Sequence, residues 1–419
     1  MTTNPLPPLL KSILLEGFLS YGPDPVTIPL TALNLLIGPN GSGKSNLIEA
    51  LSVLRAVPKD LPLPIRQGGG VKDWLWRDGK SGATEARLEV VLAEGRLITA
   101  GLVRALPSGK VKRPRREFRA TPSIRYRLVF GAEGDSFTVL DERVENEHDQ
   151  GRPKPYFYFG YENGRPMINV QQEQSPRELA RADIDPTQSI LSQRRDPEAY
   201  PELTRLADLL RQILIYRSWQ FGPDSAVRMS CRADVRTDIL SESFDNLPAR
   251  LAVLIGNPVI KRRMIELVSD LARGFDDLSI IPEGGRLQLY LSEGNRSVPA
   301  HRLSDGTLRY LCLLAILLDE HPAPLIVIEE PELGLHPDLL PTLRDLLVSA
   351  SEKTQLIVTT HSTQLVDAMT EHAESVLVCE KNHGPSVVSR LTQGEVDRWR
   401  NEGSLGSLWM SGHIGGTRW

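Results

Sequence analysis

A glycine-rich loop between an apolar strand and a helix constrains this chain more than any other feature. The continuous apolar run Leu33–Ile37 predicts a strand buried on both faces, and apolar spacing over Leu47–Val57 predicts a helix. Between them, residues 38–45 read Gly-Pro-Asn-Gly-Ser-Gly-Lys-Ser and match G-x-x-x-x-G-K-[ST] at every position. The motif and its flanking elements together favour a phosphate-binding loop over a glycine-rich turn without function.

Each part of this loop suits a nucleotide. The glycines let backbone N–H groups curl around phosphate oxygens, and the helix N-terminus adds partial positive charge. We expect Lys44 to reach the β- and γ-phosphates and Ser45 to hold Mg²⁺. The residues predicted to bind nucleotide here are Asn40, Gly41, Gly43, Lys44, Ser45 and Asn46.

A pair of carboxylates forms a second candidate site. The apolar run Leu325–Ile328 predicts a strand and ends in Glu329 and Glu330. Successive side chains of a strand diverge, so Glu329 is expected to hold Mg²⁺ while Glu330 orients or deprotonates the attacking water. The alternative is a strand that ends in solvated acids.

Two weaker motifs flank the carboxylates. Ser304, Asp305 and Gly306 open a predicted helix, where Ser304 is also an ordinary N-cap. His361 follows the apolar strand predicted at Gln355–Thr359 and is expected to touch the γ-phosphate, with a loop histidine of no role as the alternative. Their order relative to Glu330 makes them informative together.

In the order and combination of these motifs, the sequence resembles an ATP-binding-cassette-type ATPase of the SMC/RecF/OLD group, an AAA-like ATPase. The resemblance implies an α/β fold: a P-loop ABC-type head of mixed sheet and flanking helices, interrupted by an α+β insertion. Lys44, Glu330 and His361 would be catalytic. Two heads would stack head-to-tail with two ATP molecules between them, so Ser304 and Gly306 would contact the partner's ATP.

Two departures from the family pattern stand out. Glu329 replaces the usual aspartate, and Asp305 replaces the first signature glycine. A carboxylate near the triphosphate is expected to weaken binding in trans, so Asp305→Gly should tighten ATP-dependent dimerisation.

The motifs also predict the domain order. Residues 1–105 and 295–419 would form the two parts of the head, with residues 106–294 as a hairpin and helical insertion resembling a second lobe. Alternating patterns predict strands at Ile124–Phe130 and Ser136–Val144, and residues 173–220 read as helical.

Further residues are weaker candidates. The resemblance implies a Mg²⁺-sensing glutamine at the junction of head and insertion, for which Gln188 and Gln193 both qualify, and it suggests Arg66 as an arginine that couples DNA to ATP. The basic stretch 110–119, with Arg125 and Arg127, could hold DNA phosphates or form a solvated face. The candidates in that stretch are Arg113, Arg115 and Arg116.

Composition narrows the cellular setting. The chain has 419 residues, a net charge of −4 and three distant cysteines, so neither a disulfide framework nor a cysteine-rich zinc site is indicated. Without a run of about 18 apolar residues or a signal peptide, we expect a cytoplasmic protein with no membrane partner. The expected partners are a second copy, DNA and a separate nuclease.

Three functions compete. The first is DNA repair or chromosome maintenance, and the second is an anti-phage defence ATPase that controls a separate nuclease. Fewer than 60 residues follow His361, so no TOPRIM nuclease domain is expected in this chain. The third, a transporter ATPase, is disfavoured by the long insertion.

Overall fold

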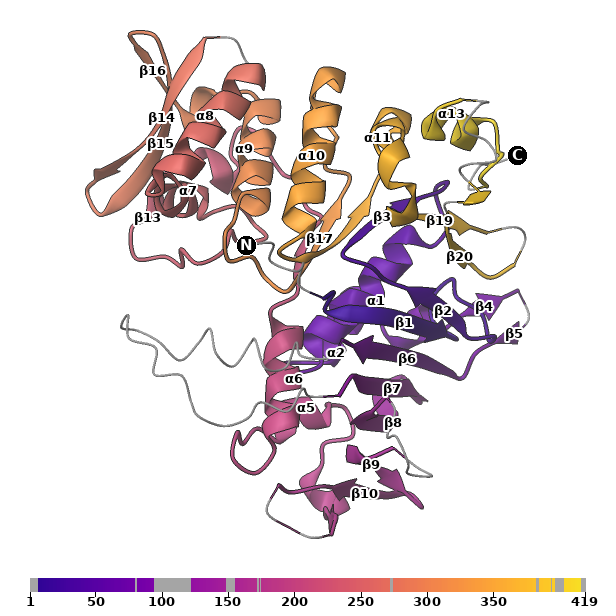
Figure 1. Cartoon of the computed structure of the whole chain (residues 1–419). Coiled ribbons are helices and arrows are strands. Elements are labelled where there is room, and N and C mark those ends of the chain that lie inside the picture. Colours follow the sequence, from indigo (N-terminus) through magenta and orange to yellow (C-terminus); the bar gives the residue numbers. More distant parts are fainter. Residues whose placement is uncertain are drawn as a thin grey trace. The chain divides into compact units, whose positions relative to one another are not determined.

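The computed structural model describes residues 7–79, 81–93, 122–147, 155–171, 173, 175–271, 274–381, 384–392, 394–395 and 403–415. The chain divides into two compact units. Figure 1 labels their helices and strands. The N-terminal unit comprises the described residues of Leu6–Ile213, Leu377–Leu391 and Ile414–Trp419. The C-terminal unit comprises those of Leu214–Val376 and Thr392–His413. In these described parts, no helix is long and apolar enough to cross a bilayer.

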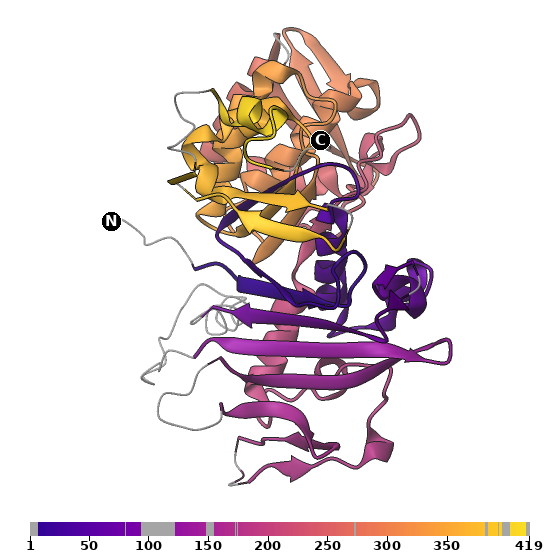
Figure 2. The same cartoon turned by 90° about the vertical axis from the view of Figure 1, so that its right-hand side faces the viewer.

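An antiparallel sheet dominates the N-terminal unit. Eight described strands form it, and their spatial order is β11 (Arg177–Glu178), β10 (Arg165–Ile168), β9 (Phe157–Glu162), β8 (Ser136–Asn146), β7 (Ile124–Glu133), β6 (Glu85–Leu92), β1 (Leu10–Glu16) and β2 (Val26–Pro29). Figure 2 shows β7 and β8 as long neighbouring strands in magenta. In β7, Tyr126 and Leu128 are buried whereas Arg125 and Arg127 lie on the opposite face, as alternation predicts.

The predicted phosphate loop connects a strand and a helix of this unit. β3 (Leu33–Ile37) is buried along its whole length, and α1 (Lys44–Ala56) begins within the loop motif. β19 (Val376–Glu380), which belongs to this unit from Leu377 onward, pairs with β20 (Val387–Arg390) as an antiparallel hairpin. The other described elements of the unit are α2 (Pro62–Gln67), α3 (Val71–Trp74), β4 (Arg77–Asp78), β5 (Ser81–Gly82), η1 (Arg181–Asp183), α5 (Ile190–Gln193) and α6 (Pro201–Arg211).

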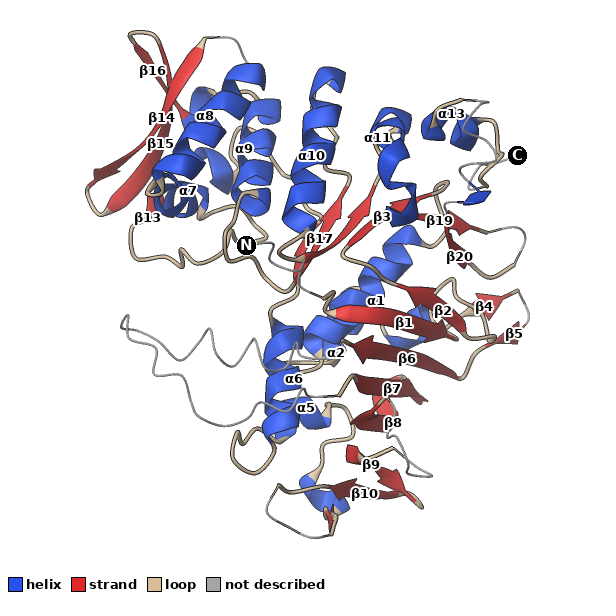
Figure 3. Ribbon diagram, viewed as in Figure 1, coloured by secondary structure: helices blue, strands red, loops and turns tan. Residues whose placement is uncertain are grey.

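Three parallel strands form the centre of the C-terminal unit. β17 (Leu325–Glu329) lies between β12 (Leu214–Tyr216) and β18 (Gln355–Thr359). Parallel strands end at the same edge, so the residues after β17 and β18 come close together. Figure 3 shows the helices α9 (Asp305–Leu317), α10 (Leu340–Ser351) and α11 (Thr363–Ala368) side by side in blue.

A smaller antiparallel sheet and two helices complete the C-terminal unit. Its strands are β13 (Cys231–Arg232), β14 (Phe275–Glu283), β15 (Arg286–Glu293) and β16 (Arg296–Pro299), and its helices are α7 (Leu247–Ile255) and α8 (Pro258–Leu271). Short 3-10 turns occur at η2 (Ala226–Arg228), η3 (Ala300–Arg302), η4 (Pro337–Leu339) and η5 (Thr370–Ser375).

The described part of the C-terminal tail packs on this unit. α13 (Leu405–Met410) buries Leu405 and Trp409, and the Gly406 N–H donates to Asp367 Oδ1 on α11 at 2.6 Å. The segment is therefore tied to the helical layer through a backbone hydrogen bond as well as apolar packing.

One secondary-structure prediction was wrong in its extent. The helix predicted across 173–220 is confined to α5 and α6, and the chain then enters β12 at Leu214. β-Branched Ile213 and Ile215 favour a strand there, and the three-residue pairing with β17 fixes it. The mixed α/β architecture agrees with the predicted fold class, while the predicted domain boundaries stay a prediction.

Candidate functional site

The phosphate loop has a backbone that only glycine accommodates at key positions. Gly38 has φ 144° and Gly43, the N-cap of α1, has φ 107°. A side chain at Gly38 would lie 2.2 Å from the carbonyl oxygen of Cys379. This curled backbone at a helix N-terminus is a ready anion site.

The side chains of the loop divide into buried and exposed groups. Lys44 is only 6% exposed, and its Nζ donates to the carbonyls of Gly38 at 2.7 Å and Pro39 at 3.0 Å. The exposed residues of the loop are Asn40, Gly41 and Ser45. The ammonium group thus lies inside the loop curve, and the Ser45 side chain is accessible at the start of α1.

A cluster of hydroxyl and amide groups stabilises the phosphate loop through hydrogen bonds. Asn46 Nδ2 donates to Ser20 Oγ at 2.7 Å, and Tyr21 Oη donates to the Gly43 carbonyl at 3.1 Å. Ser386, on the segment between β19 and β20, donates to Ser20 Oγ at 2.7 Å. Asn46, predicted to bind nucleotide, therefore uses its amide to brace the loop.

The carboxylate pair lies in the C-terminal unit at the end of β17. Glu330 has φ 46°, a left-handed conformation that is rare outside glycine and common at functional sites. Its N–H donates to the Thr359 carbonyl of β18 at 3.0 Å, and His361 Nε2 lies 3.6 Å from Glu330 Oε1. The structure thus brings Glu330 and His361 together, with Glu329 on the neighbouring strand position.

Glu332 is a buried acid in the turn that follows β17. Its Oε1 accepts hydrogen bonds from Thr360 Oγ1 at 2.6 Å and from the His361 N–H at 3.1 Å. Burial raises the pKa of the Glu332 carboxyl, although these hydrogen bonds oppose the shift. Glu332 therefore fixes the backbone that carries His361 beside Glu330.

The predicted signature motif begins helix α9. Ser304 Oγ caps the helix by accepting from the Thr307 N–H at 3.1 Å, and Gly306 lies against the carbonyl of Gly334. Ser304 and Asp305 are both exposed at this helix end. The N-cap reading of Ser304 is therefore confirmed, and a contact with ATP in trans stays a prediction.

The Asp305 carboxylate is not the isolated charge that the sequence suggested. It forms an ion pair with Arg228, whose side chain is 8% exposed. The same guanidinium donates to the carbonyls of Phe221 at 2.9 Å and Leu303 at 2.7 Å. Arg228 therefore neutralises Asp305 and anchors the loop before α9.

The segment after β12 contains residues that the sequence analysis missed. Trp219 Nε1 donates to the Glu329 carbonyl at 2.7 Å, and Arg217 Nε lies 4.0 Å from Glu329 Oε1. Gln220, exposed in the same segment, follows the strand next to β17. The strand Leu214–Tyr216 was the available signal, hidden inside the helix predicted to residue 220.

Gln188 and Gln193 do not reach the phosphate loop. Gln188 accepts from the Leu61 N–H at 3.2 Å and donates to Asp60 at 3.1 Å, beyond the C-terminal end of α1. A 13-residue helix is about 20 Å long, so Ser45 at its start lies far from this contact. Gln193 is hydrogen-bonded to the Asp185 backbone. Gln188 is therefore bonded to residues other than the phosphate loop, and its role as a metal ligand stays a prediction.

The arginines predicted to contact DNA lie in different surroundings. Arg66 is exposed at the end of α2, whereas Arg113, Arg115 and Arg116 lie outside the described residues. Arg125 pairs with Glu89 and Glu145, and Arg127 pairs with Asp141.

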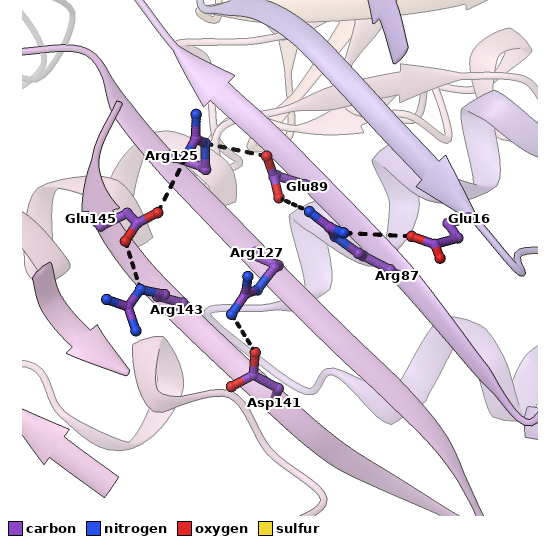
Figure 4. A network of polar contacts seen from close by, with 8 residues as sticks. All are labelled: Glu16, Arg87, Glu89, Arg125, Arg127, Asp141, Arg143 and Glu145. Carbon is purple, nitrogen blue, oxygen red and sulfur yellow. Dashed lines mark hydrogen bonds and ion pairs between the residues drawn. The ribbon is translucent and has the colours of Figure 1, made fainter. Parts of the chain in front are cut away.

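These two arginines belong to a ladder of ion pairs across β1, β6, β7 and β8 (Figure 4). The arginine ladder consists of Glu16, Arg87, Glu89, Arg125, Arg127, Asp141, Arg143 and Glu145. Every arginine drawn has an acidic neighbour, so the expected phosphate contacts of Arg125 and Arg127 are already occupied by carboxylates.

Comparisons with known proteins identify the family and the fold of this chain. Residues 33–367 match a family described as "AAA domain, putative AbiEii toxin, Type IV TA system". Among solved structures, an Smc head bound to the C-winged helix domain of ScpA has a TM-score of 0.55 and 18% identity, covering 93% of this chain and 100% of that chain. An Smc head domain with an extended coiled coil, bound to the C-terminal domain of ScpA and derived from Pyrococcus furiosus, has a TM-score of 0.52 and 16% identity, covering 95% of this chain and 99% of that chain.

At such identities the likeness concerns the fold alone, and no curated protein matches the chain. The fold nevertheless confirms the predicted ABC-type head with an antiparallel insertion. Since the family model covers most of the sequence, including the phosphate loop and the paired glutamates, the chain belongs to the AAA domain family of AbiEii type, a P-loop ATPase domain with an SMC-head-like fold.

Proposed function

We propose that this protein hydrolyses ATP with Mg²⁺ and that ATP binding drives two copies to pair head-to-tail. The observation that carries the proposal is the geometry of Glu330, held in a left-handed conformation with its carboxylate 3.6 Å from His361. A carboxylate and an imidazole at the ends of adjacent parallel strands suit the orientation of a water molecule for attack on a phosphate.

The phosphate-loop residues have complementary roles in this proposal. The curled backbone around Gly43 presents N–H groups to phosphate oxygens, and Lys44 exchanges its carbonyl partners for β- and γ-phosphate oxygens. Ser45 and Glu329 offer the oxygen ligands that Mg²⁺ prefers. When bound, Mg²⁺ would neutralise charge on the phosphates.

Gln220 is the glutamine that best fits the Mg²⁺-sensing role. It is exposed directly after β12, and Trp219 beside it is bonded to the backbone of Glu329. The segment that carries Gln220 is therefore tied to the strand that supplies the proposed metal ligand.

Pairing of two heads would use the exposed end of α9. Ser304 and Gly306 lie at a helix N-terminus, which favours anions, and each would meet the ATP of the other copy. This completes a site that one chain alone leaves open.

The deciding experiment measures ATP turnover and mass together. We expect wild-type protein to hydrolyse ATP only with Mg²⁺, Lys44→Ala to lose ATP binding, and Glu330→Gln to bind ATP and accumulate as a dimer by light scattering. Hydrolysis that survives in Glu330→Gln, or a Glu330→Gln protein that stays monomeric with ATP, would contradict the corresponding half of the proposal.

Two biological settings follow from different observations. The family description names a toxin of a toxin–antitoxin system, which favours a defence ATPase that acts with a separate nuclease or antitoxin. DNA repair or chromosome maintenance draws support from the SMC-head fold and the exposed Arg66.

Adding duplex, gapped and single-stranded DNA separates these settings. DNA maintenance predicts stimulated hydrolysis and binding by the trapped dimer, with affinity that falls steeply with salt and drops in Arg66→Ala. If DNA neither binds nor stimulates, the defence setting is favoured, and co-purification with the product of a neighbouring nuclease gene then tests it.

A further inference from the structure

Arg309 on helix α9 contacts the catalytic turn of its own subunit. It lies in the second turn of the helix that Ser304 caps. Its Nη1 donates to the carbonyl oxygen of Glu330 at 3.3 Å, and its guanidinium carbon lies 4.9 Å from the centroid of the Trp219 ring. One half-buried side chain thus connects the signature helix to the turn after β17.

Trp219 contacts the carbonyl of Glu329, the residue just before Glu330. Its indole N–H donates to the Glu329 carbonyl at 2.7 Å, and its ring stacks on Phe244 with centroids 5.0 Å apart. The stacked pair of Arg309 and Trp219 therefore holds two consecutive carbonyls at the point where the strand ends. Arginine suits this position because its planar group stacks on an aromatic face while it still donates hydrogen bonds.

The backbone that Arg309 contacts, at Glu330, is strained. Glu330 has φ 46°, and such a conformation persists only where surrounding contacts hold it. The direction of the Glu330 carboxylate depends on that backbone, so the contact from Arg309 to the Glu330 carbonyl helps set where the carboxylate points.

We propose that Arg309 is a positioning residue through which engagement of the signature end of α9 sets the geometry of Glu330 in the same subunit. The inference rests on the proposed function. When Ser304 and Gly306 meet the partner's ATP, a shift of α9 moves Arg309 and, with it, the Glu330 backbone. Each subunit would then hydrolyse its own ATP only once it has engaged its partner's.

The test compares Arg309→Gln with Arg302→Gln, which removes an exposed arginine from the turn just before the motif. For Arg309→Gln we expect kcat to fall about tenfold or more, ATP affinity to stay within about twofold, and the Hill coefficient for ATP to fall to about 1. Arg302→Gln should keep the wild-type values, with a Hill coefficient above 1. Arg309→Lys, which keeps the charge but not the planar stack, should recover only part of the rate.

Tryptophan fluorescence supplies a readout that a merely structural role would not move. The Trp219 signal is the difference between the Glu330→Gln protein and its Trp219→Phe derivative. We expect this signal to change when ATP drives dimerisation, and to stay constant when Arg309→Gln is added although the dimer still forms.

The outcomes separate the two ideas. If wild-type protein neither hydrolyses ATP nor dimerises, the proposed function itself fails. If it does both and Arg309→Gln matches Arg302→Gln in rate, Hill coefficient and fluorescence, the positioning role is overturned. Should Arg309→Gln lose its native circular dichroism, Arg309→Lys decides, because it keeps the charge but not the planar stack; a wild-type kcat and Hill coefficient for Arg309→Lys would then overturn the positioning role.

Discussion

Ser386 donates a hydrogen bond to the hydroxyl of Ser20 at 2.7 Å, although 366 positions separate the two serines in the chain. The Ser386 N–H also donates to the Ser20 carbonyl at 2.8 Å. Both hydroxyls lie directly behind Gly43, so the hairpin β19–β20 forms part of the wall that shapes the phosphate loop.

Because Ser20 and Ser386 lie so close to Gly43, Gly43→Ala tests whether the phosphate loop tolerates a side chain there. A methyl group at Gly43 would lie 2.6 Å from Ser386 Oγ, and φ 107° is itself unfavourable for alanine. We expect ATP affinity to fall more than about tenfold, measured by calorimetry. Gly134→Ala is the control, because φ is also positive there but nothing lies within 4 Å; comparable loss in both variants would contradict the steric argument.

The strained backbone at Glu330 predicts a trade between stability and activity. Glu330→Gly and Glu330→Ala both remove the carboxylate and should both abolish hydrolysis. Only glycine relieves the left-handed strain, so its free energy of unfolding should exceed that of Glu330→Ala by about 1 kcal/mol in urea. Equal stability of the two variants would show that the turn stores no strain.

The pair of Asp305 and Arg228 refines the expected effect of Asp305→Gly. Removing the carboxylate deletes a negative charge and uncovers a buried guanidinium at the signature end. We expect tighter ATP-dependent dimerisation, with a gain that shrinks as salt rises, and a loss of about 1 kcal/mol in unfolding free energy. Asp224→Gly, at an exposed position, is the charge-matched control. Sedimentation at two salt concentrations measures the gain in dimerisation, and urea unfolding measures the loss of stability. A salt-independent gain would argue against charge as the cause.

Glu142 predicts a pH dependence of stability. Burial raises the pKa of this carboxyl to about 7, and its oxygens accept from Tyr126 at 2.8 Å, from Ser189 and from the Ile190 N–H at 2.8 Å. The unfolded chain loses this proton above about pH 4.5 while the folded chain keeps it to about pH 7. Stability from this group is therefore full below pH 4.5 and is lost as pH rises to about 7, by about 3 kcal/mol.

Glu142→Gln should remove that pH dependence. The amide oxygen can accept from Ile190 while the NH₂ group donates to the two hydroxyls, so the hydrogen bonds survive without a charge. Urea unfolding at pH 5 and pH 8 should show a smaller difference for Glu142→Gln than for wild type or for Glu133→Gln, whose side chain is exposed. An unchanged difference would place the titration elsewhere.

Replacing Gln220 and replacing Gln188 are expected to have opposite effects on turnover and stability. Gln220→Ala should lower kcat about tenfold and raise the Mg²⁺ concentration needed for half-maximal rate, without affecting stability. Gln188→Ala should leave turnover unchanged and lower unfolding free energy by about 1 kcal/mol, because it loses the bonds to Leu61 and Asp60. A Mg²⁺ titration of both variants distinguishes the assignments, and the reverse pattern would restore Gln188.

Local patterns account for what the sequence could predict. The strand at Leu33–Ile37, the helix after Lys44 and the acids that end β17 follow from continuous apolar runs, glycine spacing and helix periodicity. Each of these signals is contained within about ten neighbouring residues, so no knowledge of tertiary contacts was needed.

The features that escaped prediction depend on partners distant in the chain. Nothing near Asp305 indicates that Arg228 neutralises it, and nothing near Ser20 indicates Ser386. Gln220 was missed for a different reason: leucines periodic over α6 masked the short strand that follows. A three-residue strand has too little pattern of its own, and pairing with β17 decides its structure.

The arginine ladder has a consequence for kinetics. Each of the four guanidinium groups of the ladder lies a few ångströms from a carboxylate. Beyond the Debye length of about 8 Å, the potentials of these opposite charges cancel. The ladder therefore attracts no polyanion from a distance. Its charges act only after contact, when a ligand must displace a carboxylate to reach an arginine. Any diffusional steering of a nucleic acid would therefore have to come from other parts of the chain.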